Sequence, residues 1–336
     1  MKYKKIRLKN RVKKNLIVLL CLIICILCIH NVLGYIKNLN EELVDFSFPF
    51  PSINLTFPDI DIAKKGSIDV LALGNSDLFS AFNPLQLWNE KGITSYAAGG
   101  SMQNMSATYY MLEEIFKYQN PKVLILELDN FFETRGKDDK NEAKLNTYKT
   151  CFPLFRYTPL WKQLKNKSYV QKSLANSRTL LRGYYFKTEI MPNNQGYSYM
   201  GKNNDEKVEM VKYTKKYFHK IMSLTRRKNC KVIFLCLPSA TSWNYQKHNT
   251  VAEYAKQYDV PYLDMNISDY GIGFDWKTDT RDAGNHLNHS GATKVTKFLG
   301  DYLKEHYDLI DHRGNTNFKD WEDDYQYFTT LLENKK

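Results

Sequence analysis

Apolar residues fall into short runs along the chain, separated by stretches in which they recur at helical spacing. Runs of four to six mostly apolar residues predict buried strands, and spacings of three and four predict helices packed against them. The predicted strands cover residues 69–73, 94–98, 123–128, 231–236 and 261–264. The predicted helices cover residues 84–91, about 101–120, 206–224, 246–258 and 290–305.

This alternation predicts one three-layer, flavodoxin-like α/β domain over residues 68–306, with a parallel sheet of about five strands. Ligands bind at the carboxyl ends of the strands in such sheets, so candidate chemistry is expected just after residues 73, 98 and 128. Residues 135–205 lack clean periodicity and are predicted to be an insertion with short helices. Residues 307–336 are predicted to be a C-terminal packing segment or an interaction tail.

The N-terminal region has the pattern of a membrane anchor. Residues 1–14 carry eight Lys and Arg, and residues 16–29 are uninterrupted apolar residues or cysteines, extended by more apolar residues to 36. About 20 residues are needed to span a bilayer. We predict a basic cytoplasmic leader (1–14), a transmembrane signal-anchor (15–36) and an extended linker (37–67), with the rest of the chain outside the cell membrane. The alternative, a cleaved signal peptide, is less favoured because no A-x-A-like cleavage site follows.

Charge and cysteine content narrow the function classes. The formal net charge is +12, but without the leader the chain has 40 Lys and Arg against 36 Asp and Glu, which argues against nucleic-acid binding. The six cysteines form neither a disulfide framework nor a zinc-ligand pattern. No metal and no cofactor is predicted.

Serine and glycine residues follow the first two predicted strands. Gly74-Asn75-Ser76-Asp77 would hold the Ser76 hydroxyl at the sheet edge, with its own N–H free to stabilise an oxyanion. Gly99-Gly100 lets the backbone approach a ligand at the neighbouring strand. Each motif alone is also typical of a helix cap or a tight turn.

A third candidate segment lies before the last predicted helix, which returns it to the same sheet edge. Nucleophilic catalysis by serine needs a base of pKa near 7 and a carboxylate that orients it. His286 and Asp282 could form that pair on one loop. His289 precedes Ser290, the predicted N-cap, and is expected to be a surface residue.

Together these motifs resemble the SGNH (GDSL-like) hydrolase superfamily, with His286-Leu-Asn-His-Ser-Gly-Ala292 as the strongest match. The resemblance implies Ser76 as nucleophile, His286 as general base and Asp282 as its partner. It further implies an oxyanion hole from Ser76, Gly99 or Gly100, and an asparagine after the third strand.

The chain departs from the family pattern at two places. The aspartate lies four residues before the histidine instead of three, so a bulge at Gly284 would be needed, and Asp279 is the fallback partner. After the third strand, Asn130 is the candidate oxyanion donor, because Asp129 has the wrong charge; Asn104 is a less favoured substitute.

The anchored layout resembles the membrane-tethered branch of that superfamily, including the D-alanyl transfer proteins of teichoic-acid synthesis. It implies an extracellular esterase or O-acyltransferase whose partners are an envelope glycopolymer or acyl-donor substrate, membrane lipid around the N-terminal helix, and a membrane-bound acyl-transfer protein. The alternative is a catalytically silent scaffold or binding module in envelope polymer biosynthesis. Aromatic residues of the insertion either stack on sugar rings or form its core: Tyr148, Phe152, Phe155, Tyr157, Trp161, Tyr184 and Tyr185.

Overall fold

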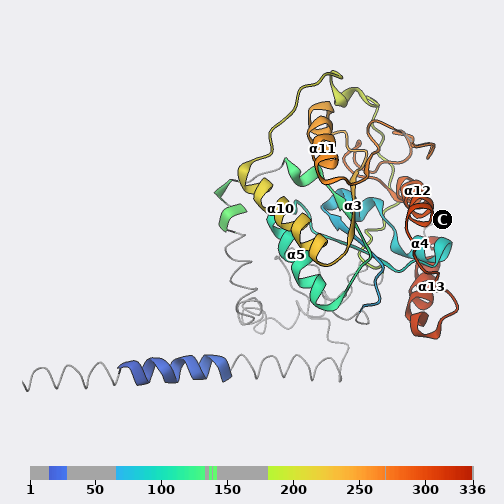
Figure 1. Ribbon diagram of the computed structural model, residues 1–336. Coiled ribbons are helices and arrows are strands. Elements are labelled where there is room, and N and C mark those ends of the chain that lie inside the picture. Colours follow the sequence, from blue (N-terminus) through green and yellow to red (C-terminus); the bar gives the residue numbers. More distant parts are fainter. Residues whose placement is uncertain are drawn as a thin grey trace, which may run out of the picture.

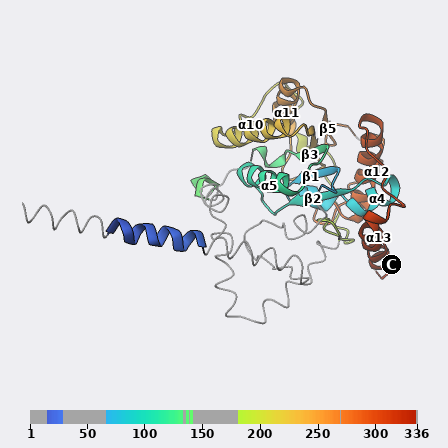
Figure 2. The same ribbon diagram turned by 60° about the horizontal axis from the view of Figure 1, so that its bottom comes forward.

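The computed structural model describes residues 15–28, 66–132, 136–137, 139–141, 181–268 and 270–334 of the 336-residue chain. Figures 1 and 2 show its main body as a central sheet with helices on both sides. The body is built from five strands that alternate with helices along the chain.

The sheet has five parallel strands in the order β2-β1-β3-β4-β5. The prediction of an α/β fold with a five-stranded parallel sheet is confirmed. The strand order reverses at β1, so the carboxyl ends of β1 and its neighbours face a crevice in which ligands bind in such folds. The strands are β1 (Val70–Gly74), β2 (Ser95–Gly99), β3 (Val123–Glu127), β4 (Lys231–Cys236) and β5 (Tyr262–Asp264).

Alternation along the strands divides the core into two layers. Leu71, Leu124 and Phe234 pack on one face, with apolar side chains of three helices, α5 (Met105–Tyr118), α10 (Lys212–Arg227) and α11 (Tyr245–Tyr258). The residues next to them in sequence, such as Val70, pack on the other face against α3 (Ser76–Ala81) and α12 (His289–His306). Both faces are therefore buried, which explains why the strands read as nearly continuous apolar runs.

The helices lie close to the predicted ranges, with differences at their first residues. Those that cover the sheet are α3 (Ser76–Ala81), α4 (Pro84–Lys91), α5 (Met105–Tyr118), α10 (Lys212–Arg227), α11 (Tyr245–Tyr258) and α12 (His289–His306). Helix α3 was not predicted because six residues are too few to show a helical period.

Side-chain hydrogen bonds explain the later helix starts. The Asn104 side chain accepts from Ala107 N–H and so begins α5 there, after the expected position near residue 101. Helix α10 begins at Lys212 and not at 206, because the preceding carbonyl groups bond to α11: Asn249 donates to the Glu206 carbonyl, and Thr250 to that of Val208. Asn288 caps α12, so Ser290 is not its N-cap as expected.

The N-terminal apolar run is helical over residues 15–28. Among the described residues, no helix is both long and apolar enough to cross a membrane. Residues 29–36 of the predicted anchor, the leader and the linker before residue 66 lie outside the described residues, as do residues 142–180 of the insertion.

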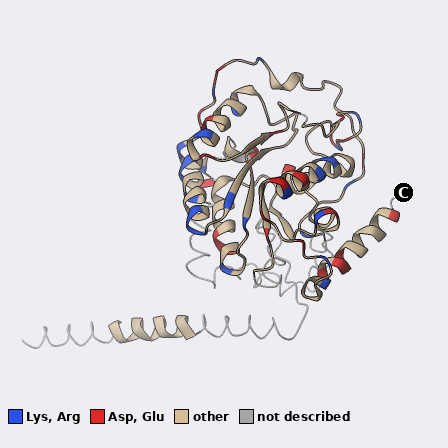
Figure 3. Cartoon of the chain, turned by 45° about the vertical axis from the view of Figure 1, so that its right-hand side comes forward, with Lys and Arg blue, Asp and Glu red and all other residues tan. Residues whose placement is uncertain are grey.

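The C-terminal segment forms η4 (Thr316–Phe318) and α13 (Lys319–Glu333), with the short η1 (Asp129–Phe131) and η3 (Ser198–Met200) elsewhere in the chain. Trp321 of α13 packs on Trp88 of α4, with ring centroids 5.6 Å apart. The Arg182 guanidinium covers the Trp321 ring and pairs with Asp320 and Asp324 on the acidic side of the helix (Figure 3). This helix therefore packs on the domain through one apolar edge.

Candidate active site

The turn after β1 places Ser76 at the carboxyl edge of the sheet. A Cβ at Gly74 would lie 2.6 Å from Glu127 Cβ, so only glycine allows β1 to end this close to β3. The next residue, Asn75, caps α3 by accepting from Asp77 N–H at 2.7 Å. Ser76 is the first helical residue, where N–H groups have no partner within the helix.

A bulged loop before α12 brings His286 to the same edge. An antiparallel bridge between Thr280 and Leu287 closes this loop. Two successive residues, Ala283 (φ 58°) and Gly284 (φ 95°), have left-handed backbone conformations. The left-handed conformations of these two residues accommodate the four-residue spacing between Asp282 and His286. They lie at the position where the sequence predicts a bulge.

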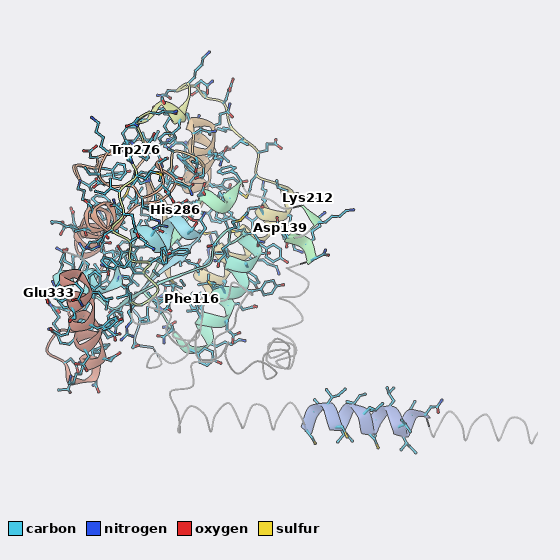
Figure 4. All side chains as sticks on the ribbon, turned by 180° about the vertical axis from the view of Figure 1, so that it is seen from behind. Phe116, Asp139, Lys212, Trp276, His286 and Glu333 are labelled. Carbon is cyan, nitrogen blue, oxygen red and sulfur yellow. The ribbon has the colours of Figure 1, made fainter. Side chains whose placement is uncertain are left out.

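Ser76, His286 and Asp282 form a continuous hydrogen-bonded chain. His286 Nε2 lies 2.8 Å from Ser76 Oγ, and His286 Nδ1 lies 2.5 Å from Asp282 Oδ2. The other Asp282 oxygen accepts from the backbone N–H of His286 at 2.6 Å. The aspartate thus fixes both the loop and the imidazole ring, as the orienting carboxylate of a serine–histidine pair must. Figure 4 shows His286 beside α3.

Asp279, the fallback partner, belongs to another network. It is fully buried, pairs with Lys294 Nζ at 2.7 Å and accepts from Ser290 Oγ at 2.7 Å. It therefore holds the loop on α12. His289 is also placed differently from the expected surface position: it is half-buried, with Nδ1 3.2 Å from Tyr184 OH.

The predicted oxyanion donors have different surroundings. A Cβ at Gly99 would lie 2.2 Å from the Gly74 carbonyl oxygen, so this glycine is required by close packing of β1 and β2. Gly100 follows β2 directly, next to residues that line the pocket. Asn104 is the cap of α5 and its Nδ2 bonds to Asp139, away from the pocket lining. The side chain of Asn130 lies outside the described part of the structure.

An open pocket of about 620 Å³ lies over Ser76 and His286. Tyr185 and Arg281 contribute to one wall, and the guanidinium of Arg281 lies 5.1 Å from the tyrosine ring centroid. Tyr184, in contrast, is fully buried, so the two insertion tyrosines divide between pocket and core. The other five predicted aromatic residues lie outside the described residues. The full lining is Asn75, Ser76, Asp77, Phe79, Ser101, Met102, Asp129, Tyr185, Thr241, Ser242, Arg281, Asn285 and His286.

Two carboxyl groups of this pocket were missed as site residues from sequence. Asp77 lies in the first turn of α3, with Oδ1 3.9 Å from His286 Nε2. Asp129 is buried after β3, and this burial raises the pKa of its carboxyl group. In the sequence, Asp77 is only the residue after the candidate nucleophile, and the charge of Asp129 argues against it as an oxyanion donor. Across the described residues, no group of three or more His, Cys, Asp or Glu side chains could hold a metal ion.

Comparison with known proteins gave structural similarity only. No protein-family model and no curated protein matches the sequence. A protein of the G-D-S-L family from Desulfitobacterium hafniense is similar in structure, at 13% identity and a TM-score of 0.38, over 70% of this chain and 98% of the other. A psychrotrophic esterase from a Pseudoalteromonas species (10%, TM-score 0.37, 70% and 97%) and a GDSL-like lipase from Bacteroides thetaiotaomicron (11%, TM-score 0.35, 70% and 87%) are also similar.

Proposed function

We propose that this chain is a serine ester hydrolase or acyltransferase of the SGNH type. The observation that carries the proposal is the chain of contacts from Ser76 Oγ through the His286 ring to Asp282, at 2.8 Å and 2.5 Å. The contact between Ser76 and His286 is within the range expected for a nucleophile and its general base, and the shorter contact with Asp282 joins the base to the carboxylate that orients it. The pocket above Ser76 provides room for an ester.

In the proposed reaction, Ser76 Oγ attacks the ester carbonyl carbon and its proton passes to His286 Nε2. The Asp282 carboxylate, bonded to Nδ1, stabilises the imidazolium that forms. The negative charge on the carbonyl oxygen is stabilised by the Ser76 N–H, which belongs to the first residue of α3 and so has no acceptor within the helix. His286 then returns the proton to the leaving alcohol, which leaves Ser76 acylated.

The second half-reaction transfers the acyl group from Ser76 to water or to a polymer hydroxyl. A hydrolase needs water at the acyl-enzyme, whereas a transferase must exclude water and admit the acceptor. The pocket is open enough for part of a large substrate to enter, and the Tyr185 ring in its wall could stack on a sugar ring that carries the acceptor hydroxyl. We therefore propose a cell-envelope glycopolymer or teichoic acid as the substrate class, with hydrolase and transferase as alternatives.

The proposed location is the outer face of the cell membrane, with residues 15–36 as a single-pass anchor and the N-terminus in the cytoplasm. The apolar run and its basic flank support this orientation. An anchored enzyme acts near the bilayer, and an acyl donor carried by a membrane-bound partner would reach it there.

The competing proposal is a silent scaffold, and one observation favours it. Asp129 lies in the pocket wall beside Ser76, and an ionised carboxylate there would oppose the negative charge of a tetrahedral intermediate. The two proposals differ in whether Ser76 is reactive.

A fluorophosphonate probe tests the proposal directly on the full-length chain in detergent. An activated serine gives a mass gain of one probe at Ser76, and the gain disappears in Ser76→Ala and in His286→Ala while the folded structure is retained. Ser101→Ala is the matched control, because Ser101 lines the same pocket and its loss should leave labelling unchanged. Absence of labelling in a folded wild-type protein would overturn the enzyme proposal and favour the scaffold.

A further inference from the structure

The Asp129 carboxyl group has one oxygen that is paired and one that is not. Oδ2 accepts a hydrogen bond from Asn75 Nδ2 at 3.1 Å. Oδ1 is buried and has no hydrogen-bond partner among the described residues. The whole side chain is 5% exposed, and it lines the pocket that contains Ser76. An unsatisfied buried carboxylate oxygen is costly, whereas a protonated one can donate to a ligand in the pocket.

Titratable groups surround Asp129 from each neighbouring element. Glu127, at the end of β3, is buried and accepts the Asp129 N–H at 2.6 Å. Asp77 of α3 lines the same pocket and acts on the pKa of Asp129, and two neighbouring carboxyl groups favour retention of one proton. Lys247 of α11 and Cys236 of β4 also interact with the Asp129 charge, and His286 lies 3.9 Å from Asp77 in the same pocket.

Burial and charge act in opposite directions on Asp129. Burial is the largest effect and raises the pKa of its carboxyl group. The positive charge of Lys247, the hydrogen bond from Asn75 and the nearby polar side chains of Ser242 and Asp77 lower the pKa by less. The net direction is upward, toward a carboxyl that stays neutral where an exposed aspartate would be ionised.

We propose that Asp129 acts as a neutral acid whose Oδ1–H donates a hydrogen bond to the oxyanion formed during attack by Ser76. This inference rests on the proposed function, since it assigns a role in the same reaction. A neutral Asp129 would not repel the negative charge of the tetrahedral intermediate, because its protonated oxygen is a hydrogen-bond donor. It also supplies a side-chain donor from the segment that follows β3, in the pocket that Ser76 lines.

The charges balance in this step. A new bond forms from Ser76 Oγ to the carbonyl carbon, the serine proton moves to His286 Nε2, and the carbonyl π electrons move onto the oxygen. The Asp129 proton stays on Oδ1 and is shared with that oxygen through a hydrogen bond. When the intermediate collapses, the electrons return to the carbonyl and the leaving alcohol takes the proton from His286.

The test is the pH dependence of 4-nitrophenyl acetate hydrolysis by the full-length wild-type protein, Asp129→Asn and Asp129→Ala. The Asp129 carboxyl group loses its proton as the pH rises through its raised pKa. The wild-type rate should therefore fall on the alkaline side of the pH profile. Asp129→Asn keeps a donor that does not titrate, so it should retain most of the rate and lose this alkaline fall. Asp129→Ala removes the donor and should lower kcat roughly 100-fold at every pH, with little change in KM.

Two results for Asp129→Asn would overturn the inference. A profile that superimposes on the wild type means that Asp129 does not control the alkaline limb. A rate well above wild type at neutral pH means that the native carboxyl is ionised there and opposes the reaction. Fluorophosphonate labelling separates this inference from the proposed function: if Ser76 is labelled and either result is found, only the role of Asp129 fails. Without labelling in the wild type, both fail.

Discussion

His286 Nε2 lies 2.8 Å from Ser76 Oγ, although the two residues are 210 positions apart in the chain. Two buried hydrogen bonds of Thr296 explain this proximity. Thr296 of α12 accepts from Asn83 N–H at 2.9 Å and donates to the Ala81 carbonyl, which ties α12 to the segment between α3 and α4. The serine helix and the histidine loop are therefore held on one rigid layer.

The two aspartates of the histidine loop should have separable effects. Asp282→Asn removes the charge that orients His286 and should lower kcat on the order of 10³- to 10⁴-fold, with a small effect on stability. Asp279→Asn breaks the buried pair with Lys294 and should reduce the free energy of unfolding by about 3 kcal/mol, while folded molecules keep their kcat. Urea unfolding and esterase kinetics on both variants measure the two effects. Equal kcat losses in both would contradict this division.

The fold was largely predictable because its signals are local and apolar. Val70, Leu124 and Phe234 belong to buried runs that alternate with amphipathic helices, and parallel sheets bury both faces of each strand. Helix starts depend on single polar contacts instead. Nothing near Glu206 in the sequence shows that its carbonyl bonds to Asn249 of α11.

The site was predictable only in part, for a geometric reason. Ser76, His286 and Asp282 could be named because each follows a strand or precedes a helix at the carboxyl edge of the sheet. Sequence reasoning excludes Asp129 as an oxyanion donor because an exposed aspartate is ionised at neutral pH. The sequence does not show that its side chain is buried with an unpaired oxygen. Burial raises the pKa of this carboxyl group, and burial is a property of the folded chain.

The bulge that allows the longer Asp282–His286 spacing should be sensitive to a single methyl group. A Cβ at Gly284 would lie 2.9 Å from Ala240 Cβ, on a backbone with φ of 95°. Gly284→Ala should therefore displace the loop, separate His286 from Ser76 and lower kcat roughly 100-fold.

Ala283→Gly is the matched control for the bulge. Ala283 is exposed and has φ of 58°, which costs an alanine about 1 kcal/mol. Its replacement by glycine should leave kcat unchanged and stability similar, because relief of this strain offsets the greater freedom of the unfolded chain. Esterase kinetics and thermal unfolding on both variants test the expectation. An unchanged kcat in Gly284→Ala would show that the bulge does not position the histidine.

The stability of the protein should decrease in acid through His289. Its ring packs against Phe186 and Phe328, and burial lowers the pKa of the imidazole below 6.5. The unfolded chain therefore binds a proton more readily than the folded one, so the free energy of unfolding falls as pH drops through about 6.5. His289→Gln keeps a polar group near Tyr184 but does not titrate, and should weaken this pH dependence. His219, whose pKa is also lowered by burial, contributes in the same direction and leaves a residual slope.

Urea unfolding at about pH 7.5 and about pH 5.5 measures this effect as the difference between the two free energies. The control is His306→Gln, which replaces an exposed histidine of the same helix and leaves the aromatic contacts of His289 in place. If His289→Gln and His306→Gln both show the wild-type difference, the acid sensitivity arises elsewhere and His289 is protonated equally in the two states. If only His289→Gln reduces it, the buried imidazole beside the site loop is neutral in the folded protein. The loop that carries His286 is then less firmly held in acid, because His289 is the first residue of the helix that follows it.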